Sequence, residues 1–432
     1  MTAKRVIAEA RSAGFTLVEL MVALTGGLFI SLAVFALARD SGRFYQRETR
    51  IANATVSGLI GFERLRADLG RAGFLSSPNI FRDTNGVCGI PDAAWPIGLR
   101  NLASIQLSTP AVKYAPLTAN GRTPPVITLA GSYSSPDVFA AKVVPAGNNV
   151  IFQLSTVEGA GALRRLGNTA MPDTPTMQAL FPALRALRVV QNGKQYYGQI
   201  TNATGGAQPT VTINSQPPIQ FRSGSALCGL REIGSGAAVP TINVVNFIQY
   251  EVRPPQTPTA IAGYQNVFSN STGAPGEDQR TELTRVELGI DGQVIDGTEE
   301  IVAEYAVDLN LQVIAVTSMT TGSDPNLSLI SPGDALFNTF TGPVFGTLNT
   351  PELIRSLRVR LGVRSREADR TAPLTNPAGQ GLLRFNIGSD PASANGPISL
   401  KGSTVFETTE TFARVRTFQA DVVLHNQASV LW

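Results

Sequence analysis

Few residues of this chain have side chains suited to catalysis. The 432 residues include one histidine, His425, and two cysteines, Cys88 and Cys228. This inventory excludes a metal site built from clustered histidines or from a Cys-x-x-Cys pair. The sequence also lacks a Gly-x-Ser-x-Gly motif, a Walker-type loop and a Gly-x-Gly-x-x-Gly placed between strand and helix. No particular pair of carboxylates stands out, so we predict neither an enzyme nor a cofactor.

Glu19 is the one ionisable residue in the apolar segment 15–38. As an α-helix this segment would rise about 36 Å, enough for the roughly 30 Å hydrocarbon core of a membrane. A carboxylate in such a span costs about 2.5–3.5 kcal/mol, which predicts a function for Glu19. The position of Glu19 depends on the helix that contains it and on the segments before and after that helix.

Two ordinary interpretations of this segment compete. Residues 1–14 are basic, and Ala36-Leu37-Ala38 has the small-residue pattern of a signal peptidase site. The segment is longer than the roughly 7–15 apolar residues of a signal peptide, however, and a Glu within it is unexpected. A plain membrane anchor explains the length but not Glu19. Arginines follow the span as well as precede it, so the positive-inside rule does not decide the orientation.

A third interpretation rests on a resemblance. After the basic leader, the sequence Gly14-Phe15-Thr16-Leu17-Val18-Glu19 resembles the processing site of type IV prepilins and type II secretion pseudopilins. The resemblance implies that a prepilin peptidase cleaves after Gly14 and that Phe15 is then N-methylated. It also implies that Glu19 meets the Phe15 amine of a neighbouring subunit and sets the axial register. Glu19 paired with its own amine, or protonated in the bilayer, is the alternative.

The apolar segment continues into an amphipathic one. Apolar residues at helical spacing and the absence of Pro predict one helix from about Phe15 to about Ala72 within a region 15–75, with residues 15–38 in the membrane. Gly73 and Pro78 are stop signals. Four glycines are expected to weaken this helix by about 1 kcal/mol each relative to Ala: Gly26, Gly27, Gly58 and Gly61.

The remainder predicts an antiparallel β-rich domain, so the fold class is α+β with a type IV pilin-like arrangement. In the variable region 76–240, short strands are expected at 137–144 and 149–156, and residues 179–190 suit a short helix or a helix and a strand. In the region 241–432, apolar residues alternate with period two, as in a sheet packed on one face, at 242–252, 284–290, 305–313, 357–364 and 412–425. Two polar segments, 254–278 and 367–402, are expected to be loops.

Residues 64–74 and the order of the last strands resemble the PilW type of minor pilin. This implies an inner-membrane protein with one span and an extracytoplasmic globular domain, which joins other minor pilins and the major pilin to prime pilus assembly. A place near the fibre tip and a tip adhesin as partner are part of the same expectation. The alternatives are a minor pseudopilin of a type II secretion system and, in another class, a membrane-anchored periplasmic hydrolase or carbohydrate-binding protein. The last alternative predicts a concave site, for which 7% aromatic residues offer little.

The remaining charged and sulfur residues have structural interpretations. Beyond an anchor the compartment is oxidising, which favours a disulfide between Cys88 and Cys228, worth about 4–5 kcal/mol by chain entropy. The arginines of one strand are expected on its charged outer face rather than docking an acidic partner: Arg358, Arg360, Arg364 and Arg366. Asp291-Gly292 and Asp296-Gly297 predict turns rather than a calcium loop. A net charge of +3 gives no basic footprint for nucleic acid.

Overall fold

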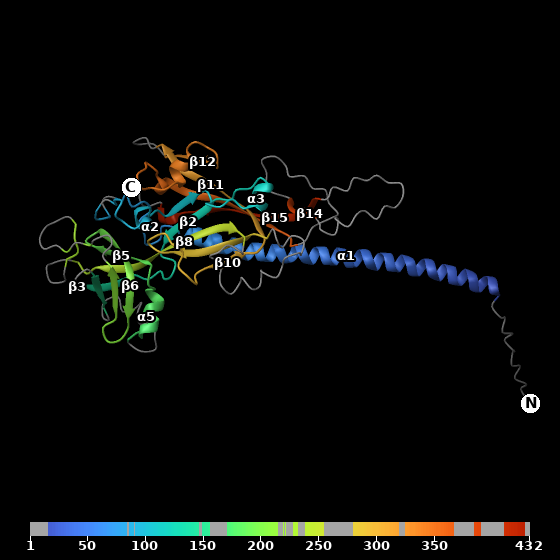
Figure 1. Ribbon diagram of the computed structural model, residues 1–432, viewed down its shortest axis with the longest axis horizontal. Coiled ribbons are helices and arrows are strands. Elements are labelled where there is room, and N and C mark those ends of the chain that lie inside the picture. The colour runs from blue at the N-terminus through green and yellow to red at the C-terminus, as the bar shows by residue number, and fades with distance from the viewer. Residues whose placement is uncertain are drawn as a thin grey trace, which may run out of the picture. The chain divides into compact units, whose positions relative to one another are not determined.

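A computed structural model describes a long helix and a globular domain of two sheets (Figure 1). The chain divides into two compact units, residues 1–53 and residues 54–432, which are described separately below. The described residues are 16–83, 86–89, 91–146, 149–155, 171–214, 219, 221, 228–231, 238–254, 280–318, 325–366, 384–389 and 410–427.

Helix α1 spans Leu17–Gly70 and confirms the predicted long N-terminal helix. Its first part, Leu17–Gly42, is apolar enough to cross a membrane and is exposed among the residues that the structure describes. After Gly70 the chain turns, and Gly73 adopts a φ of +75° in the left-handed region, as its stop signal predicts. The Gly73 N–H donates to the Ala130 carbonyl at 2.8 Å, so the backbone just after the helix is hydrogen-bonded to a strand rather than to the helix.

The globular unit contains a ten-stranded and a five-stranded sheet, whose assigned strand pairs are all antiparallel. The larger sheet contains β1 (Ile105–Ser108), β2 (Val126–Gly131), β3 (Phe139–Ala146), β4 (Asn149–Leu154), β5 (Ala186–Gln191), β6 (Lys194–Thr204), β7 (Thr210–Asn214), β8 (Thr241–Arg253), β9 (Glu282–Leu288) and β10 (Glu300–Ala303). The smaller contains β11 (Ala306–Ser318), β12 (Asn326–Ile330), β13 (Ile354–Arg364), β14 (Arg384–Ser389) and β15 (Glu410–Val423). Short helices connect them: α2 (Ile97–Arg100), α3 (Ala115–Ala119), α5 (Thr174–Leu180), α7 (Phe337–Thr341) and the 3-10 turn η1 (Pro351–Leu353).

Part of the larger sheet closes on itself. The hydrogen-bonded order β8–β3–β4–β7–β6–β5 returns to β8, which makes an antiparallel barrel. Strands β3, β5 and β6 of this barrel lie together in Figure 1. The first half of β8 belongs to the barrel, and its second half pairs with β2 and β9 in the open part of the sheet. Strand β8 therefore belongs to both parts.

Separate cores stabilise these parts. The barrel is filled by buried side chains such as Phe152, Leu187 and Ile213. A larger core joins the end of α1 to both sheets, with Leu65 and Leu69 of the helix fully buried in it. Burying such side chains contributes about 1.5–3 kcal/mol each, so α1 is held from its second half onward by packing.

The strand predictions from period-two alternation are confirmed, and the alternatives for 179–190 resolve into the end of α5 followed by β5. One expectation is wrong in part, because strand β14 lies within the predicted loop 367–402. Phe385 and Ile387 are buried there, and their strand pairs with β15. A short alternation of apolar and polar residues is therefore enough to form a strand within a largely polar segment. Most of the predicted loop 254–278 lies outside the described residues.

Gly58 and Gly61, expected as weak points of the helix, lie where the helix packs against strands. A methyl group at Gly61 would overlap the backbone of Val302, and one at Gly58 would meet the ring of Phe418 at 2.5 Å. Both glycines allow the helix to approach the strands closely.

Candidate functional site

The N-terminal end of α1 contains Glu19, the candidate assembly residue, whereas Gly14 and Phe15 lie outside the described residues. The Glu19 carboxylate accepts hydrogen bonds from the Thr16 backbone N–H and hydroxyl, both at 3.0 Å. The Glu19 N–H donates to the Thr16 hydroxyl oxygen at 3.2 Å. This reciprocal arrangement is a capping box, which satisfies N–H groups that have no partner within the helix.

Thr16 was missed by the sequence analysis, although the signal was present. The pattern Thr16-Leu-Val-Glu19 before an apolar run is the Ser/Thr-x-x-Glu signature of a helix start. Glu19 thus has a structural partner within its own chain, and its negative charge also lies favourably at the positive end of the helix dipole.

The apolar surface that follows is extensive. Within Leu17–Gly42 the helix is apolar enough to span a membrane, and large side chains such as Leu17, Phe29 and Leu37 are more than 70% exposed. A surface of this size in a water-soluble protein marks a region that contacts lipid or other protein. It can serve as a membrane span, as a signal segment or as a helix packed against other helices.

A buried ionic cluster fixes the other end of α1 to the larger sheet. The Arg285 Nε donates to Asp68 Oδ2 at 2.9 Å, and the Tyr250 hydroxyl donates to the same oxygen at 2.7 Å. Asp68, Tyr250 and Arg285 are all less than 8% exposed. Tyr250 and Arg285 are direct cross-strand partners in β8 and β9, so the sheet register presents both groups to the helix.

Electrostatics within this cluster favour the charged pair. Burial alone would lower the pKa of Arg285, but the hydrogen bond to Asp68 and its charge raise the pKa above its usual value. Burial and the negative charge of Asp68 raise the pKa of Tyr250, which keeps its phenol protonated and donating. The Tyr133 hydroxyl donates to the Asp68 carbonyl at 3.1 Å. The last turn of α1 is thereby bound through side chain and backbone.

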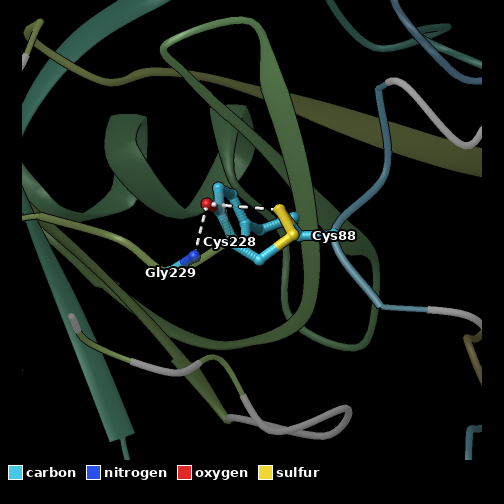
Figure 2. Close-up of a disulfide and its surroundings, with 4 residues drawn as sticks. Cys88, Cys228 and Gly229 are labelled. Atoms are coloured by element: carbon cyan, nitrogen blue, oxygen red, sulfur yellow. Dashed lines mark hydrogen bonds between the residues drawn. A yellow bond between two sulfur atoms is a disulfide. The ribbon is translucent and has the colours of Figure 1, made fainter. Parts of the chain in front are cut away.

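The expected disulfide between Cys88 and Cys228 is formed, with Cα atoms 5.4 Å apart (Figure 2). The Cys88 N–H donates to the Gln195 carbonyl of β6 at 3.0 Å, which places the segment after α1 against the barrel. The Tyr196 hydroxyl accepts from the Gly229 N–H at 3.0 Å and lies 3.5 Å from the Cys88 sulfur. The bond thus joins two irregular segments to the same part of the barrel.

The arginine stripe is only partly as expected. Arg358 is paired with Asp421 at the surface, and Arg360 donates to Asp308 Oδ2 at 3.0 Å. The expectation of a charged outer face is wrong for Arg364, whose side chain is fully buried. Its guanidinium donates to the carbonyls of Ser365 and Arg366 and lies 5.0 Å from the Tyr305 ring centre. Hydrogen bonds and ring contacts replace the water that this guanidinium loses.

The remaining candidates have the ordinary roles that the sequence predicts for them. Gly292 and Gly297 have φ values of +76° and +77°, and Asp291 Oδ1 accepts from the Gln293 N–H at 3.0 Å, as in Asx turns. His425 is exposed. Within the described residues, no three His, Cys, Asp or Glu side chains come close enough to hold a metal ion.

Comparisons with known proteins leave the class of the protein open. Neither protein-family models, nor curated proteins, nor solved structures give a match to this chain.

Proposed function

We propose that this chain is a minor pilin of the PilW type, a structural subunit that helps to prime type IV pilus assembly at the inner membrane. One observation carries the proposal. The processing pattern that ends in Glu19 lies directly at the start of an apolar helix whose surface no other part of the described chain covers. A capped helix that begins just after the expected cleavage position suits a segment that survives cleavage intact.

The proposed cleavage has a physical consequence. Removal of residues 1–14 would create an amine on Phe15, one helical turn before the Glu19 carboxylate. In a helix bundle of low dielectric constant, an unpaired charge of either sign is costly, whereas an ion pair is less so. Each charge would then be buried without a partner unless the Glu19 carboxylate of one subunit lies beside the Phe15 amine of the next. This requirement favours one axial register between neighbouring subunits.

The globular domain supports a structural role. The end of α1 is joined to this domain by the shared apolar core and by the buried ionic cluster. The disulfide between Cys88 and Cys228 adds a covalent link within the domain itself. In the proposed assembly the domain would remain outside the helix bundle and contact other minor pilins and the major pilin.

The test is the mature N-terminus, determined by mass spectrometry of the chain from cells with and without prepilin peptidase. We expect an N-methylated Phe15 only when the peptidase is present, and a Gly14→Ala variant that stays unprocessed. Gly26→Ala is the matched control, since a methyl group there meets nothing within 4 Å. Cleavage after Ala38, or a Phe15 terminus without the peptidase, would refute the proposal.

The phenotype of Gly14→Ala separates a pilus from a secretion system. We expect loss of surface pili with unchanged protein secretion. Loss of secretion with normal piliation would assign the chain to the type II secretion pseudopilins instead.

A further inference from the structure

A recess opens over strands β1, β2, β8 and β9 of the larger sheet. Its volume is about 200 Å³, room for a small molecule rather than a single water. The apolar part of its lining comes from the exposed Ile97 at the rim and from Phe247 and Leu288 in the floor. Phe247 and Leu288 lie directly opposite each other in β8 and β9 and are largely buried. Gln106 and Thr128, which lie opposite each other in β1 and β2, contribute polar groups beside it.

Two backbone segments form the remaining walls of the recess. One is helix α2, and the other is the turn 289–293 that contains Asp291-Gly292. The Gly98 N–H donates to the Ile290 carbonyl at 2.7 Å, and a side chain at Gly98 would collide with that carbonyl. A second bond, from the Gly289 N–H to the Gln293 carbonyl at 2.8 Å, closes the turn. The walls are therefore held by backbone hydrogen bonds, and the recess is preformed.

Several polar groups of the lining are available to a ligand. Within the described part of the chain, no hydrogen bond engages the hydroxyl of Thr128 or the side-chain amide of Gln293. Gln106 donates through its amide nitrogen to the Asn101 carbonyl, which leaves the amide oxygen directed to other partners. Asp291 accepts the Gln293 N–H with one carboxylate oxygen and retains the other. The lining thus offers both donors and acceptors beside an apolar surface.

Charge narrows the class of ligand. The lining contains one carboxylate, that of Asp291, and no Lys or Arg. Phosphate, sulfate or carboxylate groups would meet a like charge and no cation, so anionic ligands are disfavoured. A purely apolar ligand would leave the amides and the hydroxyl without partners, which is also unfavourable.

We propose that this recess binds a neutral saccharide unit. A pyranose has faces rich in C–H groups, which suit the exposed Ile97 side chain above the apolar floor, and hydroxyl groups that both donate and accept hydrogen bonds. Thr128 and Gln293 can do the same, while Asp291 and the Gln106 oxygen accept from sugar hydroxyls. The proposal rests on the geometry of the recess and is independent of the pilin assignment.

The experiment is a titration of the full-length chain in detergent with a panel of neutral sugars, followed by saturation-transfer NMR. The panel contains glucose, galactose, mannose and N-acetylglucosamine, with sialic acid and a sulfated galactose as anionic comparisons. We expect saturable millimolar binding of at least one neutral sugar and none of the anionic ones. Absence of binding by every neutral sugar, or a preference for the anionic ones, would overturn the proposal.

Variants then locate the binding. Thr128→Val keeps the shape but removes the hydroxyl, and Gln293→Ala removes an amide from the exposed rim; each is expected to weaken binding at least tenfold. Thr212→Val, in barrel strand β7 and outside the lining, is the matched control and should bind as the wild type does. Equal sugar affinity in all three variants would mean that the sugar binds elsewhere and would contradict the proposed recess. Circular dichroism verifies that each variant is folded.

Discussion

Arg285 and Asp68 are 217 positions apart in the sequence, yet the Arg285 Nε lies 2.9 Å from Asp68 Oδ2 inside the globular domain. Asp68 is in the last turns of α1, and Arg285 is in the centre of β9. The Tyr250 hydroxyl donates to the same carboxylate oxygen, so Asp68 has a second hydrogen-bond donor besides its counter-ion. This pair links the end of the long helix to the sheet by a fixed, directional contact.

Removing one partner of this pair should be strongly destabilising. Arg285→Met leaves the Asp68 carboxylate buried without its cation, and we expect the free energy of unfolding to fall by about 3–5 kcal/mol. Urea unfolding of the full-length chain measures the loss. The Asp68→Asn, Arg285→Met double variant should recover part of it, since it buries no uncompensated charge. The matched control is Arg358→Met, which breaks the exposed pair with Asp421 and should change stability little. Similar losses from Arg358→Met and Arg285→Met would contradict the role assigned to burial.

Glu282 should make stability depend on pH. Burial raises the pKa of this carboxyl to about 7, although the adjacent Arg280 guanidinium opposes the rise. The folded state therefore holds a proton that the unfolded state, with a pKa of about 4.3, releases earlier. The contribution of Glu282 to stability is greatest below the unfolded pKa and is lost as the pH rises through the folded pKa of about 7. The loss is about 4 kcal/mol at 1.4 kcal/mol per unit of pKa difference.

Comparison with Glu282→Gln isolates this effect from the other carboxylates. The free energy of unfolding of the variant minus that of the wild type should increase between about pH 4 and pH 7 and then stay constant. Thermal unfolding in a series of buffers measures it. A difference independent of pH would show that Glu282 ionises normally in the folded protein.

Gly61→Ala should destabilise the contact between α1 and β10. The added methyl group meets the rigid Val302 carbonyl, and overpacking of this kind costs about 1–3 kcal/mol despite the better helix propensity of Ala. Gly70→Ala is the control in the same helix, because the nearest atom to its methyl group would be 3.9 Å away. We expect that variant to be neutral or stabilised by up to about 1 kcal/mol in urea unfolding. A stabilising Gly61→Ala would mean that the helix and strand can separate at no cost.

Glu19→Gln distinguishes the two roles available to Glu19. Glutamine keeps the capping-box hydrogen bonds with Thr16 but removes the charge, whereas Glu19→Ala removes both. If the charge pairs with a neighbouring Phe15 amine, both variants should be processed normally and both should fail to assemble, as counted by piliation. Normal piliation in Glu19→Gln would assign Glu19 to helix capping alone.

Loss of the disulfide should weaken the barrel. The Cys88→Ala, Cys228→Ala variant is expected to lose about 2–5 kcal/mol, since the bond closes a loop between residues separated by 140 positions. Thermal unfolding under non-reducing conditions measures the loss, and reduction of the wild type should reproduce it. Mass spectrometry that found two alkylatable thiols in the wild-type chain isolated from cells would show that the bond is not formed in cells.

The sequence predicts this fold well where its periodicity is long. Helix α1 and strands β8, β9, β11, β13 and β15 follow from apolar residues spaced at helical or strand period. The closure of β5 onto β8 does not follow, because alternation shows that a segment is a strand but not which strand it pairs with. Arg364 was misassigned for a related reason. A charged residue in an alternating strand suggests a solvated face, whereas the aromatic rings and carbonyls that make the burial of Arg364 favourable come from other parts of the local sequence or of the fold.

At the candidate site, Glu19 could be recognised because a carboxylate is conspicuous in an apolar segment. Its partner Thr16 was less conspicuous, since Thr is common in such segments and only its spacing to Glu19 marks a cap. The ion pair between Asp68 and Arg285 could not be predicted from the sequence, because the residues around each one carry no information about its distant partner.

Strand β8 also determines how the domain would respond to mechanical load. The same backbone runs from the barrel into the open sheet, and each of its residues is paired with at least one neighbouring strand. A pulling force between the two parts, directed along this strand, would load many of those hydrogen bonds at once in shear rather than opening them one after another. The connection between barrel and sheet is thus a paired strand that transmits tension, which is a useful property in any subunit anchored by its helix and pulled from its far end.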